Sequence, residues 1–323
     1  MPPLPIAPEV SLDLKRHGVF LFNEGLSPTA LKATVRRIET MGFGAVWFPE
    51  AAGREPFVTA AFILDHTEHL VAATGILNIY GRDPMVTAMG QQTLAEMSGG
   101  RFLLGLGVSH AFFVEARGHA YGKPLATMRN YVAALRQAHT GISVTRNLLV
   151  EGFEPQSVGR GALGTMTTEA GAMPVVLAAL GPKMTSLAGE IAQGAHPYNT
   201  TPAHTRRCRE LLGPAAWLCP AQRVCLTKDA RKARRVGRQL LGLYLTLPNY
   251  RNMLLDSGFD DADLEDGGSD RLIDQLLGWG DQEAIRAYVQ AHLDAGASHV
   301  CIQAVDADRP THPDFAALEA VLG

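Results

Sequence analysis

The chain reads RFLLGLGVSH from Arg101 to His110, and this stretch decides the fold. Its leucine-rich run is typical of a strand that is buried on both faces of a parallel sheet. Gly105 and Gly107 remove side chains where a ring or a neighbouring backbone has to come close. His110 then follows at the carboxyl end of the strand, where parallel α/β proteins bind their ligands. The alternative, from this strand alone, is that the glycines serve packing and His110 is a surface loop residue.

Short strands alternate with helices along most of the chain. Besides the strand that begins at Arg101, apolar runs predict strands at residues 18–22, 45–48, 70–79, 174–180, 194–198, 222–227 and 299–305. Helical spacing of apolar residues separates them, as in the helix that Ser27 and Pro28 begin and Gly42 ends. The first four strand–helix units are each about 30 residues long, which is typical of βαβ units with right-handed crossovers. Eight such strands predict an α/β fold, a TIM-type (β/α)8 barrel.

Two stretches depart from this regular alternation. Residues 141–173 are rich in Gly, Thr and Ser and predict a long excursion with short strands. Residues 244–280 predict a mostly helical insertion, and Asp281 is expected to cap the final helix. Since long loops inside compact domains are usually functional, we interpret the first stretch as an excursion rather than a domain boundary. The whole chain, residues 1–323, is therefore predicted to be a single domain.

The composition is that of an ordinary globular protein. Of 323 residues, 46% are hydrophobic and 19% charged, and the formal net charge is −3, which indicates neither a nucleic-acid nor a membrane-binding surface. No apolar run approaches the roughly 20 residues of a membrane-spanning helix. The first eight residues are rich in proline and do not resemble a signal peptide. Four cysteines without Cys-x-x-Cys spacing are expected to be free thiols in a reducing cytoplasm.

With these units in place, the sequence resembles the luciferase-like monooxygenase family, whose members use FMN or the deazaflavin coenzyme F420. The resemblance covers nearly the whole chain and rests on the order of four segments. They are MGFGAVW at 41–47, GRFLLGLG at 100–107, ALGPKM at 179–184 with Leu187 and Ala188, and DAGASHV at 294–300. The resemblance is strongest to actinobacterial F420-dependent oxidoreductase-like members. In these the second strand ends in Trp-x-Pro-Glu, and residues 244–250 and 269–272 recur.

The resemblance implies a cofactor ring over the third strand, beside a non-proline cis peptide that corresponds here to Gly75–Ile76. A glycine inside a strand independently indicates a bulge or a close approach, although plain packing is the alternative. Free N–H groups at a helix start suit a phosphate, or else form an ordinary strand-to-helix turn. We assign the phosphate to Ala179, Leu180, Gly181, Pro182, Lys183 and Met184, with Asn78, Val108 and Ser109 as further cofactor contacts.

Two ionisable residues end predicted strands at the same mouth of the barrel. Glu50 follows the second strand and His110 the fourth. A hydride carrier needs a nearby acid or base, because the substrate oxygen gains or loses a proton as the hydride moves. In F420-dependent relatives a histidine ends strand two and a glutamate strand four, so the order here is exchanged. We predict Glu50 and His110 as the catalytic pair, with a different reaction as the alternative.

Further residues are expected to contact the substrate. The aromatic side chains predicted to line an apolar pocket are Phe22, Tyr198, Tyr244 and Tyr250. Arg54 either holds an anionic substrate or pairs with Glu55 on the rim. His66 and His69 complete no ligand set of known spacing, so no metal site is predicted.

The resemblance implies an oxidoreductase that transfers hydride to or from a small organic substrate with coenzyme F420. The alternatives are an FMN-dependent monooxygenase and a non-catalytic flavin-binding barrel. Family members are commonly dimers, so we expect a homodimer in which Phe57, Phe62 and Ile63 contribute to a helix interface.

Overall fold

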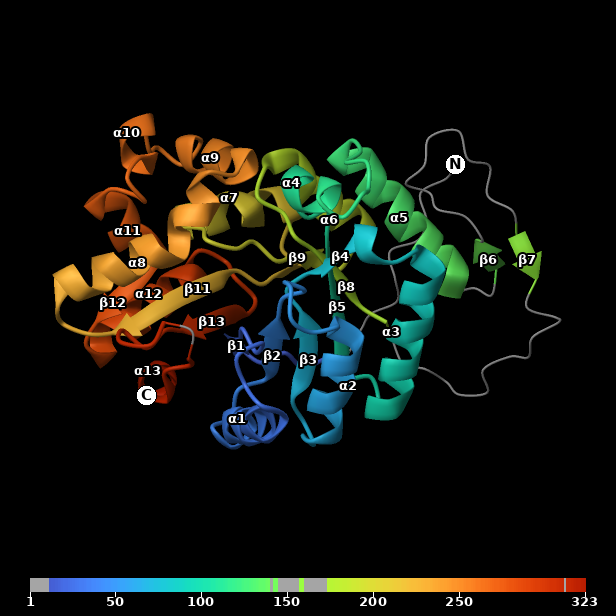
Figure 1. Cartoon of the computed structure of the whole chain (residues 1–323), viewed down its shortest axis with the longest axis horizontal. Helices are drawn as coiled ribbons and strands as arrows, with labels where there is room; N and C mark the ends of the chain where they lie inside the picture. Colours follow the sequence, from blue (N-terminus) through green and yellow to red (C-terminus); the bar gives the residue numbers. More distant parts are fainter. Residues whose placement is uncertain (1–11, 140–141, 145–156, 160–172, 311) are drawn as a thin grey trace.

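The computed structural model describes residues 12–139, 142–144, 157–159, 173–310 and 312–323. Within these ranges, eleven strands form one curved sheet in which every paired neighbour is parallel (Figure 1). The strands are β1 (His17–Phe20), β2 (Ala45–Phe48), β3 (Val71–Thr74), β4 (Leu77–Asn78), β5 (Phe102–Gly107), β8 (Val175–Leu177), β9 (Gly194–Ala195), β10 (Trp217–Leu218), β11 (Ala221–Leu226), β12 (Leu277–Gly280) and β13 (Val300–Ala304).

The sheet curls round on itself. Its neighbours follow the order β10-β9-β8-β5-β3-β2-β1-β13-β11-β12, and β4 also pairs with β5. Tyr198 follows β9, and Ala221 is the first residue of β11. A parallel bridge between these two residues joins the two sides of the sheet. The predicted TIM-type barrel is therefore confirmed.

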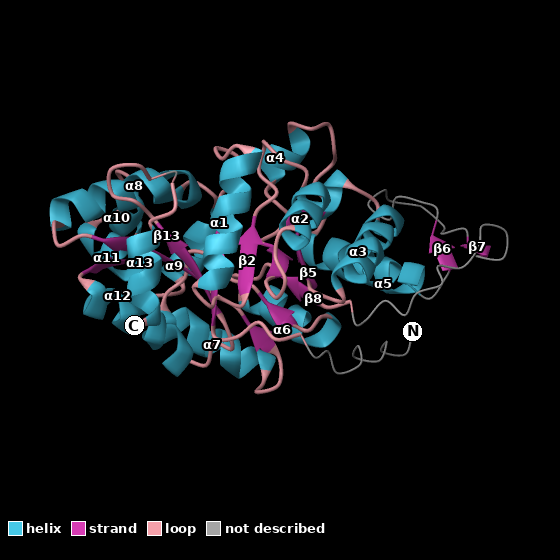
Figure 2. Ribbon diagram, turned by 90° about the horizontal axis from the view of Figure 1, so that it is seen from below, coloured by secondary structure: helices cyan, strands magenta, loops and turns pink. Residues whose placement is uncertain are grey.

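Helices cover the outside of the sheet (Figure 2). They are α1 (Pro28–Thr40), α2 (Pro56–Asp65), α3 (Pro84–Ser98), α4 (Ala111–Glu115), α5 (Pro124–His139), α6 (Pro182–Ile191), α7 (Pro202–Leu212), α8 (Ala230–Leu245), α9 (Pro248–Leu255), α10 (Asp261–Leu264), α11 (Asp270–Leu276), α12 (Gln282–Asp294) and α13 (Phe315–Leu322). The side chains of Ser27, Asp83 and Thr201 accept hydrogen bonds from first-turn N–H groups of α1, α3 and α7, which fixes where these helices begin. No helix in the described ranges is long and apolar enough to cross a membrane.

The glycines of β5 allow close packing against β3. A Cβ on Gly105 would lie 2.0 Å from the carbonyl oxygen of Thr74, and one on Gly107 would lie 2.4 Å from Cδ1 of Ile76. The Thr74 hydroxyl donates to the Gly105 carbonyl and accepts from its N–H, both at 2.8 Å. The close approach predicted at these two positions is confirmed, and it fixes the β3 segment against the strand that leads to His110.

The third predicted strand is not continuous. Residues 70–79 were expected to form one strand, but the structure divides them into β3 and β4. The interruption lies at Gly75–Ile76, whose peptide bond is cis. After β4 the chain forms the single-turn 3-10 helix η1 (Ile79–Gly81), where the side chain of Asn78 accepts a hydrogen bond from the Tyr80 N–H.

The insertion at 244–280 is mostly helical, as predicted, but it ends in the strand β12, which pairs with β11. Its helices share a hydrophobic cluster with the sheet, which includes Leu241, Leu245, Met253, Leu272 and Leu277. Figure 1 shows α8, α10 and α11 at the end of the molecule opposite β6 and β7. The prediction that the helix after Asp281 is the last one is wrong, because α13 follows β13.

The excursion lies only partly in the described ranges. There, β6 (Ile142–Val144) and β7 (Ser157–Gly159) form an antiparallel pair, which confirms short strands. The rest of the predicted excursion, residues 141, 145–156 and 160–172, lies outside the described residues.

Candidate active site

The carboxyl ends of the strands bring the predicted site residues to one mouth of the barrel. Phe22 follows β1, Glu50 follows β2, Ile76 follows β3, His110 follows β5 and Tyr198 follows β9, and each is half-buried. Residues around a concave opening typically show such intermediate exposure. Trp47, inside β2, is by contrast fully buried.

The cis peptide at Gly75–Ile76 is held in place by the neighbouring strand. The Gly75 N–H donates to the Phe48 carbonyl at 2.8 Å, and the Glu50 N–H donates to the Ile76 carbonyl at 3.1 Å. A Cβ on Gly75 would lie 2.8 Å from the Phe20 ring and 3.0 Å from Nε2 of His196, so a larger residue would collide with the barrel interior. The cis bond expected from the resemblance is present in this chain.

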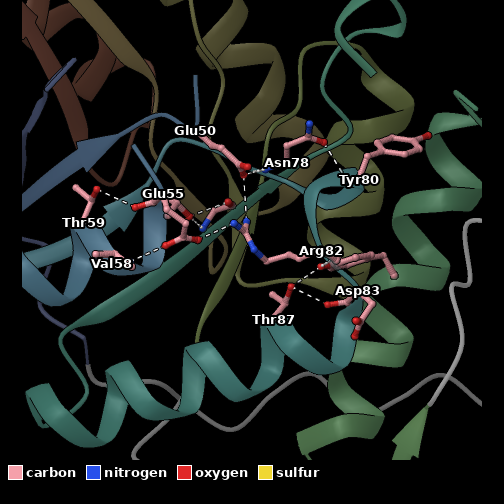
Figure 3. A network of polar contacts seen from close by, with 12 residues as sticks. Glu50, Glu55, Val58, Thr59, Asn78, Tyr80, Arg82, Asp83 and Thr87 are labelled. Atoms are coloured by element: carbon pink, nitrogen blue, oxygen red, sulfur yellow. Dashed lines mark hydrogen bonds and ion pairs between the residues drawn. The ribbon is translucent and has the colours of Figure 1, made fainter. Parts of the chain in front are cut away.

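Glu50 joins β2 to the segment that follows the cis bond. Its Oε2 accepts hydrogen bonds from the Asn78 N–H at 2.8 Å and from Nη1 of Arg82 at 3.1 Å. Figure 3 shows Arg82 between Glu50 and Glu55, and its Nη2 lies 2.6 Å from Oε1 of Glu55. Glu55 also caps α2 through the Val58 N–H at 2.7 Å. The Glu50 and Arg82 side chains are each only 12% exposed, so this ion pair is largely shielded from water.

His110 lies where the insertion meets the barrel mouth. Its side chain hydrogen-bonds Asn249, and its ring centroid lies 6.0 Å from that of Tyr250 and 6.1 Å from that of Phe113. Burial lowers the pKa of His110 below its usual value, with the Asn249 bond acting in the opposite direction. The neutral imidazole is therefore favoured near pH 7. No hydrogen bond joins His110 to Glu50, both of which the structure describes, so the predicted pair shares the mouth without touching.

An aromatic wall crosses the mouth from β1 to the insertion. Ring centroids lie 5.6 Å apart for Phe20 and Phe22, 5.1 Å for Phe20 and Tyr198, 5.5 Å for Tyr198 and Tyr244, and 5.0 Å for Tyr244 and Tyr250. The four aromatic residues predicted to contact substrate are thus brought together. Phe20, which links two of them, was not predicted.

Of the two roles considered for Arg54, pairing with Glu55 is not what the structure shows, and contact with an anionic substrate stays a prediction. Nη2 of Arg54 donates to the Leu26 carbonyl, and its expected partner Glu55 pairs with Arg82 instead. In the structure Arg54 therefore ties the loop after β2 to the loop after β1.

The turn from β8 to α6 has the features of an anion site. Gly181 occupies the N-cap position without any side-chain hydrogen bond to the first-turn N–H groups. The ring Nε2–H of His204 donates to the Leu180 carbonyl at 2.7 Å and holds the turn. Lys183 is exposed beside it. A Cβ at Gly181 would meet no atom within 4 Å, so the space before this helix is open.

Several buried polar atoms near the mouth have no hydrogen-bond partner among the described residues. They are Oδ1 of Asn23, Nε2 of His196, Nδ2 of Asn199, Oγ1 of Thr200 and Nη1 of Arg223. His196 donates through Nδ1 to the Cys219 carbonyl at 2.7 Å, which leaves a lone pair on Nε2. Since buried polar groups are normally paired, such a cluster indicates a missing ligand.

Sequence reasoning missed Arg82, Arg223 and His196. Arg223 carried a signal, because a charged residue inside an apolar predicted strand has to be paired or functional. Arg82 precedes the capping residue Asp83 and gave no comparable signal. No group of three or more potential metal ligands occurs among the described residues.

A model of the luciferase-like monooxygenase family matches residues 11–299. The chain belongs to this family. A curated relative of this luciferase-like protein is the 5,10-methylenetetrahydromethanopterin reductase of Methanolobus tindarius, which is 26% identical to it over 293 residues. The match covers 81% of this chain and 86% of the reductase. Together with the solved structures below, it makes the luciferase-like protein an enzyme, an oxidoreductase.

Two solved structures show the same fold as the luciferase-like protein, each covering 95% of this chain and 96% of the other. One is an F420-dependent secondary alcohol dehydrogenase in complex with an F420–acetone adduct, with a TM-score of 0.69 and 17% identity. The other is the oxygenating constituent of 3,6-diketocamphane monooxygenase from Pseudomonas putida, a type II Baeyer–Villiger monooxygenase in complex with FMN, with a TM-score of 0.70 and 15% identity.

The residues at the mouth of the luciferase-like protein fit a flavin-type cofactor. A ring of this kind carries both hydrogen-bond donors and acceptors at its edge, and the unpaired atoms include acceptors on Asn23 and His196 and donors on Asn199 and Thr200. The uncapped start of α6 suits the phosphate.

Proposed function

We propose that this enzyme uses coenzyme F420 to transfer a hydride to or from a small organic substrate. The observation that carries the proposal is a half-buried, neutral histidine at the same barrel mouth as the cis Gly75–Ile76 segment. The reductase that matches most of the chain and the F420-dependent dehydrogenase with the same fold support it. The whole chain works as one domain in this proposal.

The predicted cofactor residues and His110 each have a part in this proposal. The ring is held by Gly75, Ile76, Asn78, Val108 and Ser109, and the phosphate by the turn from Ala179 to Met184. When bound, the cofactor accepts or supplies the hydride. His110, as a neutral imidazole, accepts the proton of a substrate hydroxyl, and Tyr250 and Asn249 orient its ring.

Glu50 keeps its predicted place in proton transfer as a proposal. Its carboxylate already accepts two hydrogen bonds, and these also allow a positioning role for the segment that starts at Asn78. A single substitution can separate the two roles, as argued below.

Cofactor titration tests the proposal. Fluorescence titration of the purified protein with F420, FMN and NADPH is expected to give saturable binding of F420, with FMN and NADPH at least tenfold weaker. Tight FMN binding with oxygen-dependent turnover would replace the proposal with a monooxygenase, the activity of the FMN-bound structure of the same fold. Binding of a flavin-type cofactor without turnover of any carbonyl or alcohol would leave a non-catalytic barrel.

We also propose that the enzyme is a homodimer in a reducing cytoplasm. Apolar side chains exposed on α2 and α3 are Val58 (69%), Val86 (50%), Met89 (57%) and Met97 (62%), with Phe57 and Phe62 half-buried beside them. Ile63, which was expected to contribute, is fully buried in the core and cannot reach a partner. All four cysteines are free and buried, which suits a reducing compartment.

A further inference from the structure

The barrel holds a buried arginine that has no carboxylate partner. Arg223 of β11 is 3% exposed; its Nη2 donates to the Tyr198 hydroxyl at 2.7 Å and its Nε to Oε1 of Gln303 at 3.2 Å. Its Nη1 has no hydrogen-bond partner among the residues that the structure describes. No Asp or Glu of the described ranges forms an ion pair with it, whereas Arg234, on the next helix, pairs with Asp270 and Asp274. Burying an unpaired charge is costly, so such a residue is kept for a reason other than stability.

The groups that contact Arg223 are neutral acceptors and aromatic rings rather than anions. Its guanidinium carbon lies 4.9 Å from the ring centroid of Tyr198 and 5.3 Å from that of Tyr244. The Tyr198 and Tyr244 rings pack edge to face, and the Tyr198 hydroxyl donates to Oε1 of Gln303 at 2.8 Å. Burial raises the pKa of Tyr198 and of Tyr250, so both keep their protons. The positive charge of Arg223 acts in the opposite direction and lowers the pKa of both hydroxyls.

This cluster adjoins the proposed proton-transfer residue. Tyr250 packs against Tyr244 on one side, and its ring lies 6.0 Å from that of His110 on the other. The Tyr198 ring is half-buried and faces the mouth, so a ligand in the mouth lies against it. A positive charge with an unpaired N–H and aromatic walls, near a neutral histidine, suits an organic acid better than a neutral substrate.

We propose that Arg223 binds the carboxylate of an organic-acid substrate through its unpaired Nη1. This inference rests on the proposed function, because it places the carboxylate of that substrate beside the residue that handles its proton. Nη1 supplies the free donor, and the rings of Tyr244 and Tyr250 contact the apolar part of the molecule. The proposed phosphate site of the cofactor is a different one, at the start of α6.

Binding of benzoate and benzamide to the protein without cofactor tests the proposal. The two probes have the same shape and differ in charge, and both suit aromatic walls. Calorimetry is expected to show benzoate binding at least tenfold tighter than benzamide, and Arg223→Met is expected to abolish this difference. Arg234→Met removes an arginine that already has carboxylate partners and is expected to leave the preference intact. Arg223→Lys keeps the charge, and it is expected to keep part of the preference and to fold even where Arg223→Met does not.

The outcomes separate this proposal from the proposed function. An equal affinity of the wild type for both probes overturns the carboxylate site, as does a preference that survives in Arg223→Met or that is absent from a folded Arg223→Lys. A folded Arg223→Met that loses F420 or FMN affinity tenfold while keeping the benzoate preference assigns Arg223 to the cofactor and also overturns it. A preference that depends on Arg223, in a protein that binds neither F420 nor FMN, upholds the carboxylate site and rejects the proposed function.

Discussion

His110 is the residue on which the proposed proton transfer depends most directly. We expect His110→Ala to lower kcat by about 10²–10⁴-fold at saturating cofactor while the cofactor Kd stays within about twofold. Because burial lowers the pKa of His110, the neutral base predominates above that pKa. Alcohol oxidation by the wild type should therefore rise with pH through a value below 6.5 and then level off, and the variant should lack this limb. His119→Ala, on the exposed loop nearby, is the control. A weakened cofactor Kd with kcat intact would remove His110 from the mechanism.

Glu50→Gln separates proton transfer from positioning. Glutamine keeps an oxygen that can accept from the Asn78 N–H and from Arg82, so the fold of the mouth is preserved. We expect kcat to fall by about 10²-fold or more, with little change in cofactor Kd, because the amide cannot exchange the proton. Glu55→Gln, which changes the other carboxylate on Arg82, is the matched control. A kcat within about twofold of the wild type would limit Glu50 to holding the segment after the cis bond.

For single residues, the sequence was informative where the residue type and its place in the pattern alone indicate a role. The position of His110 at the end of a strand could be predicted from the residues, whereas the cis bond at Gly75–Ile76 was expected only from the family resemblance. The partner of Glu50 could not, because Arg82 lies 32 positions away and only the three-dimensional fold brings the two together. Arg54 was paired with the wrong group for the same reason, since its acceptor is the backbone carbonyl of Leu26.

Among the secondary-structure elements, the start of α6 makes the sharpest prediction. Gly181 has an extended φ of −84° and open space around it, so Gly181→Asp is expected to fold normally. Its carboxylate would cap the helix and repel a phosphate. We expect F420 and FMN affinity to fall at least tenfold, about 1.4 kcal/mol. Gly181→Ser, which caps without charge, should lose less. An unchanged Kd for both cofactors in fluorescence titration would move the phosphate elsewhere.

Long periodic elements were predictable and short ones were not. The helices α1, α3 and α12 have capping residues and apolar spacing over 13 to 15 residues, which leaves little ambiguity. The strands β10 and β12 have two and four residues, too few to show an alternating pattern, and they form because the sheet edge beside them offers free hydrogen-bonding groups. The break between β3 and β4 likewise depends on the contact of Gly105 with Thr74 across strands.

For the whole molecule, the apolar face of α2 and α3 predicts self-association. The chain has a mass of 34.7 kDa, and light scattering at micromolar concentration should give about twice that value. Met89→Lys together with Val58→Lys places charge on this face and is expected to give monomers. Leu243→Lys on α8, where the residue is 56% exposed, is the matched control. A wild-type monomer, or dimers in the double variant, would reject this interface.

The buried histidines predict how the protein responds to acid. Burial lowers the pKa of His196, His292 and His299 to about 4 each, against about 6.5 in the unfolded chain. Between these two pKa values the unfolded state binds more protons than the folded state. The free energy of unfolding therefore falls as the pH falls, by up to about 4 kcal/mol per pH unit for the three histidines together. Urea unfolding between pH 6.5 and 4 measures this slope. His292→Gln should reduce the proton uptake by about one, and an uptake below one in the wild type would contradict the prediction.

The separate hydrophobic cluster of the insertion has a consequence for how this enzyme can diversify. Leu241, Leu245, Met253 and Leu272 pack with one another and with β12, while the cis bond and the α6 turn lie on other strands. Recombination at residues 241 and 277 would thus exchange the segment between them, which contains most of this hydrophobic cluster together with Tyr244 and Tyr250. Chimeras between relatives joined at these two points are the natural starting library for new substrates, since each would keep the residues of the proposed cofactor site from its host.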